Sequence, residues 1–92
     1  MENIRFSKCI SWQHIPKLEY AFVYNIITKT YYEFFEINYY IWMTIYGKQP
    51  VDLNGIVLEI CKEYDVSKEM ATADCKEFIN QLYLFHLVEY DN

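Results

Sequence analysis

The stretch Tyr31–Trp42, YYEFFEINYYIW, decides the fold, because an aromatic strand pattern passes into a helical pattern with no linker between them. Alternation over its first half places Tyr32 and Phe34 on one face of a strand, and Tyr31 and Glu33 on the other. The second half and the residues just after it place apolar side chains at helical spacing, namely Ile41, Trp42 and Ile45. The sequence therefore predicts a strand that turns directly into a helix.

Two further strands are predicted upstream of this junction. Residues 10–15 alternate between apolar and polar side chains, and Pro16 ends the pattern. Residues 20–25, YAFVYN, are rich in aromatic and β-branched side chains, as strands are. Residues 26–29 would form the turn into the strand at residues 30–34; they contain no glycine, so the turn type stays open.

The first helix is expected to begin within residues 35–38, with Asn38 as its N-cap. Gly47 suits the left-handed position that ends many helices. Pro50 prevents the helix from continuing, because proline lacks the N–H that the next turn needs. The sequence therefore predicts a helix that is closed at Gly47.

Two more helices complete the chain. Asp52 is the expected N-cap of the second helix, and Gly55 in its first turn either allows close packing or frays that end. Ser67 caps the third helix. The apolar face of the second helix is Leu53, Ile56, Val57, Ile60, Cys61 and Tyr64; that of the third is Ala71, Cys75, Phe78, Ile79, Leu82 and Phe85. The third stripe is wide, so one flank is expected in the core and the other beside a groove. Leu87 and Val88 would form a short final strand or tuck under the sheet.

Strands followed by helices predict an α+β fold. We expect one domain over residues 1–92, a winged helix-turn-helix-like arrangement with a three-stranded antiparallel sheet followed by three helices. Residues 1–9 are polar and mixed, which predicts a loosely ordered arm.

Composition excludes several classes of function. The net charge is −5 and the eight basic residues are scattered, which disfavours binding to nucleic acid or to a membrane surface. Hydrophobic residues make up 53% and aromatic residues 20%, with ten tyrosines that suit either a partner surface or a small core. No signal peptide or membrane-length apolar run is evident.

The reactive side chains define no catalytic or metal centre. Cys9, Cys61 and Cys75 show neither metal-ligand spacing nor a disulfide framework, so we expect a reduced, cytoplasmic protein. His14 and His86 lie in no Ser-His-Asp or Cys-His pattern, and two glycines cannot form a phosphate loop. The sequence predicts neither an enzyme nor a cofactor.

The segment from Thr30 to Val88 resembles the PqqD-like family, also called RiPP recognition elements. The residues that carry the resemblance are Tyr31, Tyr32, Glu33, Phe34, Ile41, Trp42, Gly47, Ile56, Ile60, Glu63, Tyr64, Asp65, Val66, Ala71, Asp74, Cys75, Phe78, Ile79, Leu82, Leu87 and Val88. Two positions depart from the family pattern: Phe35 replaces a capping Asn, which Asn38 would supply, and His86 replaces a Gly that precedes the closing Leu-Val. Both departures concern local geometry and carry no chemistry.

The resemblance implies a peptide-binding function without catalysis. In this family the leader of a ribosomally made precursor peptide adds as an antiparallel strand beside the third strand, in a groove against the third helix. Carried over to this chain, the leader-binding residues are Thr30, Tyr31, Tyr32, Glu33, Phe34, Asp74, Cys75, Phe78, Ile79 and Leu82. Tyr31 and Glu33 would cover the peptide, and Glu33 and Asp74 would be available to a Lys or Arg of the leader. The expected second partner is a separate maturase, often a radical S-adenosylmethionine enzyme.

Other interpretations stay open at this point. A small winged-helix DNA-binding regulator has the same fold class, although Glu69, Asp74 and Glu77 outnumber Lys68 and Lys76 on the third helix. A structural module could form a homodimer through its free sheet edge. The start at Met1 favours a stand-alone protein. The precursor, its modification and the partner enzyme are not encoded in this sequence.

Overall fold

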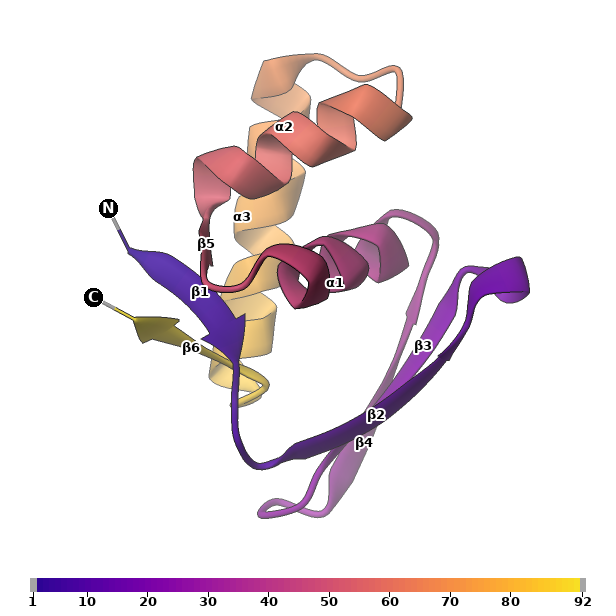
Figure 1. Cartoon of the computed structure of the whole chain (residues 1–92), viewed down its shortest axis with the longest axis vertical. Helices are drawn as coiled ribbons and strands as arrows, with labels where there is room; N and C mark the ends of the chain where they lie inside the picture. The colour runs from indigo at the N-terminus through magenta and orange to yellow at the C-terminus, as the bar shows by residue number, and fades with distance from the viewer. Residues whose placement is uncertain (1, 92) are drawn as a thin grey trace.

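The computed structural model describes residues 2–91 as an α+β fold with two small antiparallel sheets and three helices. Its elements are β1 (Asn3–Phe6), β2 (Ile10–Ile15), the short 3-10 helix Pro16–Leu18, β3 (Tyr20–Asn25), β4 (Thr30–Phe35), α1 (Glu36–Lys48), β5 (Val51–Asp52), α2 (Leu53–Glu63), α3 (Lys68–Leu84) and β6 (Val88–Asp91). Figure 1 shows the β2-β3-β4 sheet on one side of the helices and the β5-β1-β6 sheet on the other. No helix within the described residues is long and apolar enough to cross a bilayer.

The three strands expected from the pattern are confirmed. They pair in the order β2-β3-β4, with Ile10 opposite Asn25 and Thr30 opposite Asn25 on its other side. Residues 26–29 form the turn, in which Lys29 takes a left-handed conformation with φ of 59°. The expected final strand is also present, as β6.

The N-terminal residues correct one prediction. Residues 3–6, expected in a loose arm, form β1, the central strand of the second sheet. Ile4 lies opposite Val51 on one side and Tyr90 on the other, and it is 2% exposed. A four-residue strand has no strong local pattern, and it is stabilised here by partners that are distant in the sequence.

Helix boundaries follow the expected caps in two of three cases. The side chains of Asp52 and Ser67 accept hydrogen bonds from the N–H groups of Gly55 and Met70, so both predicted caps are confirmed. In α1 the prediction of Asn38 was wrong, because Phe35 occupies the N-cap without a side-chain bond.

The end of α1 also differs from the prediction. Gly47 is not left-handed; the helix continues to Lys48 and ends at Gln49, whose φ of −60° and ψ of 139° are extended. The following Pro50 explains this end, because proline disfavours the helical conformation in the residue before it.

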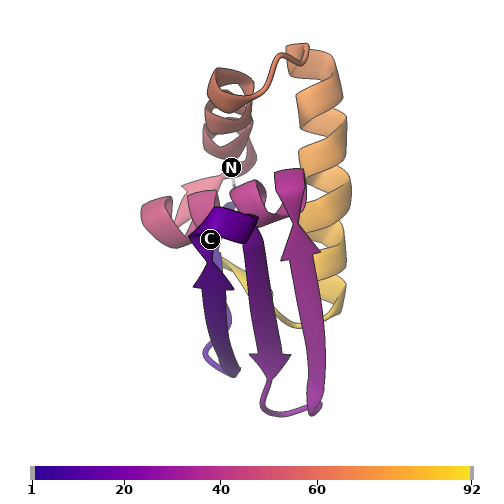
Figure 2. The same cartoon turned by 90° about the vertical axis from the view of Figure 1, so that its right-hand side faces the viewer.

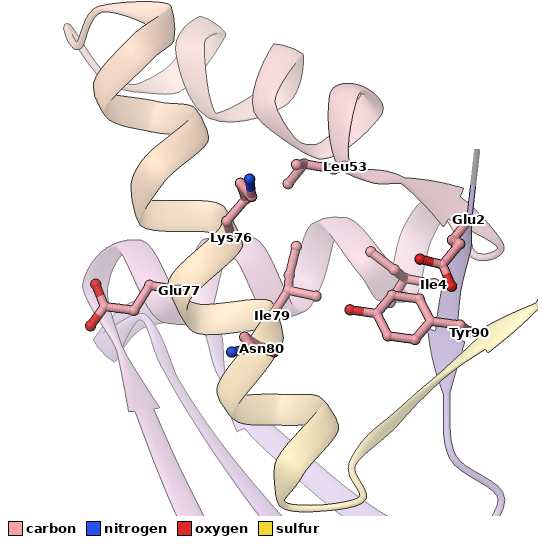
Figure 3. Close-up of a pocket in the computed structure, with 8 residues that line it drawn as sticks. All are labelled: Glu2, Ile4, Leu53, Lys76, Glu77, Ile79, Asn80 and Tyr90. Carbon is pink, nitrogen blue, oxygen red and sulfur yellow. The ribbon is translucent and has the colours of Figure 1, made fainter.

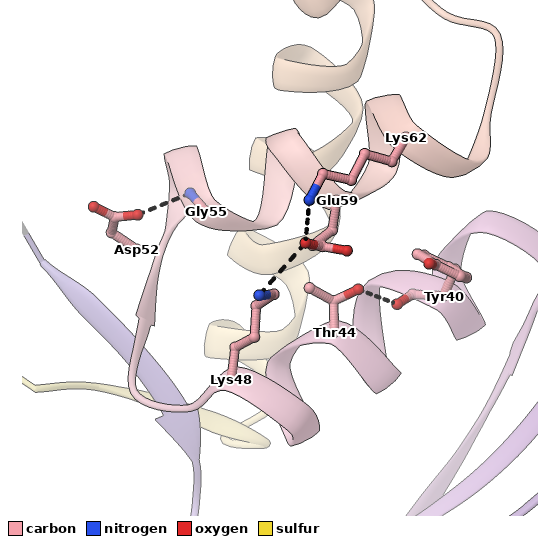
Figure 4. A network of polar contacts seen from close by, with 7 residues as sticks. All are labelled: Tyr40, Thr44, Lys48, Asp52, Gly55, Glu59 and Lys62. Atoms are coloured by element: carbon pink, nitrogen blue, oxygen red, sulfur yellow. Dashed lines mark hydrogen bonds and ion pairs between the residues drawn. The ribbon is translucent and has the colours of Figure 1, made fainter.

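Ion pairs and one close approach join α2 to its neighbours (Figure 4). The Glu59 carboxylate lies 3.2 Å from the Lys62 Nζ and 3.4 Å from the Lys48 Nζ on α1; the hydrogen bond from Lys62, together with the charges of both lysines, lowers the pKa of Glu59. A Cβ on Gly55 would lie 2.9 Å from Val51 Cγ2, so this glycine permits close packing at the start of α2.

The main core lies between the sheets and the helices. Its largest fully buried side chains include Trp42, Ile41, Ile45, Ile56, Ile60 and Leu82. Viewed from the side, β4 is the outer strand of its sheet and α3 runs next to it (Figure 2). The strand–helix neighbourhood that the resemblance pointed to is thus formed.

Candidate functional site

The free edge of β4 is the first element of the candidate site. Within the described residues, β4 pairs with β3 alone, so one row of its backbone N–H and C=O groups has no strand beside it. An unpaired edge of this kind can accept an extended peptide through main-chain hydrogen bonds.

Two backbone hydrogen bonds show which residues of β4 direct their N–H and C=O groups to the free edge. Glu36 N donates to Glu19 O over 3.3 Å, one position beyond the Tyr20–Phe35 pair. Since bonded and non-bonded pairs alternate in antiparallel sheets, residues 30, 32 and 34 bond to β3. The bond from Ile26 N to Cys9 O, 2.8 Å, shows that the even-numbered residues of β3 bond to β2. The odd-numbered residues of β3 therefore bond to β4, which agrees with this assignment. The backbone groups of residues 31, 33 and 35 therefore point to the free edge.

Two side chains of β4 face α3 and form the floor of the site. The ring of Phe34 packs perpendicular to Phe78, with centroids 5.0 Å apart, and Phe34 is 6% exposed. Tyr32 stacks on Phe85 at 4.6 Å, with 19° between the ring planes. These two aromatic pairs mark the two ends of the surface along which β4 and α3 meet beside the free edge, which we call the β4–α3 groove.

Tyr31 and Glu33 lie on the opposite face of the sheet. Tyr31 stacks against Phe22 at 5.1 Å, and the hydroxyl of Tyr20 donates to Glu33 Oε2 over 2.7 Å, which raises the pKa of Tyr20. The alternation predicted from the sequence is thus observed. One consequence is that Glu33 and Asp74 are on different sides of the strand, so they do not form a joint site for one basic side chain.

A hollow of about 300 Å³ lies where β4 passes into α1, against the middle of α3. Its lining residues are Ile37, Asn38, Asp74, Glu77, Phe78 and Gln81. Of these, sequence reasoning had selected Asp74 and Phe78. The missed residues on α3, Glu77 and Gln81, follow Asp74 at i+3 and i+7, so helical periodicity applied to its polar face would have found them.

Three predicted groove residues belong instead to the core. Cys75 and Leu82 are fully buried and Ile79 is 3% exposed, all as members of the main apolar cluster. Burial, with the nearby Asp74 carboxylate, raises the pKa of the Cys75 thiol to about 11. Thr30 lies exposed at the start of β4. The inner flank of the α3 stripe therefore packs on the core, and Phe78 lies at its border with the groove.

A larger cleft of about 650 Å³ lies beyond the Tyr32–Phe85 end of the groove. It is lined by Ser7, Cys9, Asn25, Ile27, Thr28, Tyr83, Leu84, His86, Val88 and Glu89. Asn25 joins its walls: Nδ2 donates to Phe85 O over 3.2 Å, while Oδ1 accepts from Ile27 N and Thr28 N. The β3–β4 turn is thereby held against the end of α3.

The end of α3 is regular although the family's glycine is replaced. His86 adopts φ of 60°, the left-handed conformation that the glycine would supply. The N–H of Leu87 donates to Leu82 O over 2.9 Å, and the N–H of His86 to Tyr83 O over 3.0 Å, which together form a Schellman cap.

A third hollow, of about 510 Å³, lies on the other side of α3 (Figure 3). It is lined by Glu2, Ile4, Leu53, Lys76, Glu77, Ile79, Asn80 and Tyr90. Ile4 and Tyr90 face each other across paired strands, so this hollow adjoins one face of the β5-β1-β6 sheet. Among the described residues, no group of three or more His, Cys, Asp or Glu side chains could hold a metal ion.

The fold defines the class of protein: a small α+β domain with a winged-helix-like order of strands and helices and a free strand edge beside its last helix. Residues 21–88 match the family model described as coenzyme PQQ synthesis protein D (PqqD), and the chain belongs to that family. The family resemblance inferred from the sequence is confirmed.

A solved structure supports the same assignment. The chain resembles "TbiB1 in Complex with the TbiA(beta) Leader Peptide" with a TM-score of 0.82 and 26% sequence identity, over 92% of this chain and 94% of that one. No curated protein matches the chain.

Proposed function

We propose that this protein binds the leader segment of a ribosomally made precursor peptide as an additional strand on β4, and presents it to a separate modifying enzyme. The observation that carries the proposal is the free edge of β4 beside α3, in a fold that resembles a protein solved with a leader peptide. The outward N–H and C=O groups of residues 31, 33 and 35 would pair with the leader backbone, and the groove side chains would select its sequence.

Recognition without catalysis is sufficient for this role. Binding both the leader and a maturase raises the effective concentration of the precursor at the enzyme. Ordering a flexible leader opposes binding, so we expect dissociation constants of about a micromolar. The maturase in this family is often a radical S-adenosylmethionine enzyme, and co-purification with the enzyme encoded beside this gene tests that second contact. The three free cysteines are compatible with the reducing cytoplasm, where such a precursor is made.

The charge distribution disfavours the DNA-binding alternative. The protein carries a net charge of −5, and α3, which would enter the major groove, presents exposed Glu69, Asp74 and Glu77. A gel shift on random duplex DNA at low salt is expected to show no complex.

Amide hydrogen exchange followed by NMR tests the proposal at single residues. Suitable probes are the TbiA(beta) leader and peptides selected from a random library against the full chain. Binding is expected to slow exchange at the N–H groups of Tyr31, Glu33 and Phe35, whereas those of Tyr32 and Phe34 are already protected by β3. Selected peptides that bind but leave the exchange of Tyr31 and Glu33 unchanged would contradict strand addition at this edge.

A further inference from the structure

The two ends of the β4–α3 groove differ in chemistry. At the end marked by Phe34 and Phe78, the lining of the 300 Å³ hollow includes the carboxylates of Asp74 and Glu77, with Asn38 and Gln81 as its other polar side chains. No basic residue lines this hollow. The ion pairs found among residues 2–91 do not involve either carboxylate. Ile37 and Phe78 add an apolar wall, along which the methylene stem of a Lys or Arg can lie while its charge reaches a carboxylate.

The opposite end is apolar. Beyond Tyr32 and Phe85 lies the 650 Å³ cleft, whose rim includes Ile27, 73% exposed, and Leu84, 65% exposed. Phe85 itself is 38% exposed, Leu84 and His86 on either side of it line the cleft, and Asn25 of the cleft wall donates to its carbonyl, so the cleft lies next to the Tyr32–Phe85 pair. Large apolar side chains exposed next to a concave surface are typical of a binding site.

The direction of β4 determines which end of a bound peptide lies at which end of the groove. β4 runs from Thr30 at the turn to Phe35 at the start of α1. A peptide paired antiparallel to β4, the commoner arrangement, therefore passes Phe35 first and leaves beside Thr30. Its upstream residues meet the carboxylates, and its downstream residues reach the apolar cleft.

We propose that the two ends of the groove select a leader with a basic side chain upstream and a bulky apolar side chain downstream. The inference rests on the proposed function and specifies the chemistry of its ligand. Residues of paired strands stay in one-to-one register, so the two selected side chains lie roughly six to eight positions apart. Charge complementarity determines the upstream partner, and the position of the exposed apolar rim next to the Tyr32–Phe85 pair determines the downstream one.

Selection of random 14-residue peptides by mRNA display on the full-length protein tests this inference. Binders are expected to carry Lys or Arg upstream and Leu, Ile, Phe or Trp downstream, in that order. The most enriched peptide is then compared with an analogue whose basic residue is Gln and with one whose apolar residue is Ser.

Variants of the protein test which end of the groove recognises the basic side chain of the peptide and which end recognises the apolar one. Replacing the basic residue is expected to weaken binding about two- to fivefold on the wild type, the range of an exposed ion pair, and to have no effect on D74N/E77Q. A matched control, D65N/E69Q, changes net charge equally at exposed carboxylates outside the groove and should behave as the wild type. Replacing the apolar residue is expected to cost roughly tenfold on the wild type and little on I27S/L84S.

The outcomes separate this inference from the proposed function. If selected peptides slow exchange at Tyr31 and Glu33 but lack the two side chains, carry them in reverse order, or lose equal affinity on wild type and variants, the inference is overturned and strand addition stands. If no selected peptide slows exchange there, strand addition itself fails and the inference fails with it.

Discussion

The side-chain amide of Asn25 donates a hydrogen bond to the backbone carbonyl of Phe85 across 3.2 Å, joining residues 60 positions apart in the sequence. Asn25 is fully buried, and its oxygen accepts from two N–H groups of the β3–β4 turn. Phe85 in turn stacks on Tyr32 of β4. The Asn25 side chain thus holds both the β3–β4 turn and the end of α3, and so fixes the position of β4 relative to α3 at the candidate groove.

The first prediction concerns this connection. Asn25→Ala removes the bonds to the turn and leaves the carbonyls of Phe85 and His86 without their side-chain donor. We expect the free energy of unfolding to fall by about 2–3 kcal/mol in urea titrations, since buried polar groups lose their partners. Asn54→Ala, at an exposed position of α2, is the matched control and should change stability little. Equal effects of both substitutions would show that the bond does not order the groove.

The phase of the β4 edge gives a second prediction. Glu33→Pro removes an outward N–H and leaves the ladder to β3 intact, so the protein should stay folded and bind selected leader peptides about tenfold or more weakly. Tyr32→Pro removes a ladder bond and should lower stability by about 3 kcal/mol. Glu33→Gln keeps the N–H and controls for the lost carboxylate. Circular dichroism melts measure stability, and fluorescence anisotropy measures peptide binding. Unfolding by Glu33→Pro but not by Tyr32→Pro would show that the N–H of Glu33 bonds to β3 and that of Tyr32 points to the free edge.

Cysteine reactivity gives a third prediction. Burial raises the pKa of Cys75 to about 11, and its side chain is fully buried, so its thiolate is scarce and inaccessible near pH 8. Iodoacetamide should modify the partly exposed Cys9 and Cys61 first, as read by mass spectrometry of tryptic peptides. All three should react at similar rates in denaturant. Early labelling of Cys75 in the folded protein would place it on the groove, as the sequence had suggested.

The same raised pKa predicts a dependence of stability on pH. The folded state favours the neutral thiol, so this stabilisation is complete below the ordinary pKa of 9.0 and is lost as pH rises through about 11. The loss of stability over this interval should be smaller in Cys75→Ala, which lacks the titrating group. Urea titrations of both proteins at pH 8, 9 and 10 measure the difference.

The left-handed residue that ends α3 leads to a fourth prediction. His86 is exposed with φ of 60°, a conformation that costs roughly 1 kcal/mol in any residue with a Cβ. His86→Gly should therefore raise the free energy of unfolding by up to about 1 kcal/mol. Asn80→Gly, at an exposed interior position of the same helix, should lower it slightly, by about 0.3 kcal/mol, because glycine is only a little less favourable in a helix than asparagine. A loss of stability in His86→Gly would show that the imidazole makes a contribution of its own.

Local patterns predicted most of the elements. Alternation identified β2 and β4, aromatic and β-branched composition identified β3, and capping chemistry located the starts of α2 and α3, because all these signals depend on residues close in sequence. The strand at residues 3–6 escaped prediction because its stability comes from pairing with residues 51–52 and 88–91. The start of α1 lies within the expected residues 35–38, but its N-cap and its end were misassigned, because Phe35 caps it without a side-chain bond and Pro50 overrides Gly47.

For the candidate site, the sequence by itself determined that Tyr32 and Phe34 share one face of an aromatic strand, that Asp74 and Phe78 lie on a helix, and that the chain is acidic. The tertiary structure decided which side of the wide α3 stripe is covered: Cys75, Ile79 and Leu82 pack on the core, while Asp74, Glu77 and Gln81 line the hollow beside the start of α1. It also decided which N–H groups of β4 stay free, through its pairing with β3. The physical reason is that periodicity assigns a side chain to a face, whereas only the packing of distant segments determines what that face meets.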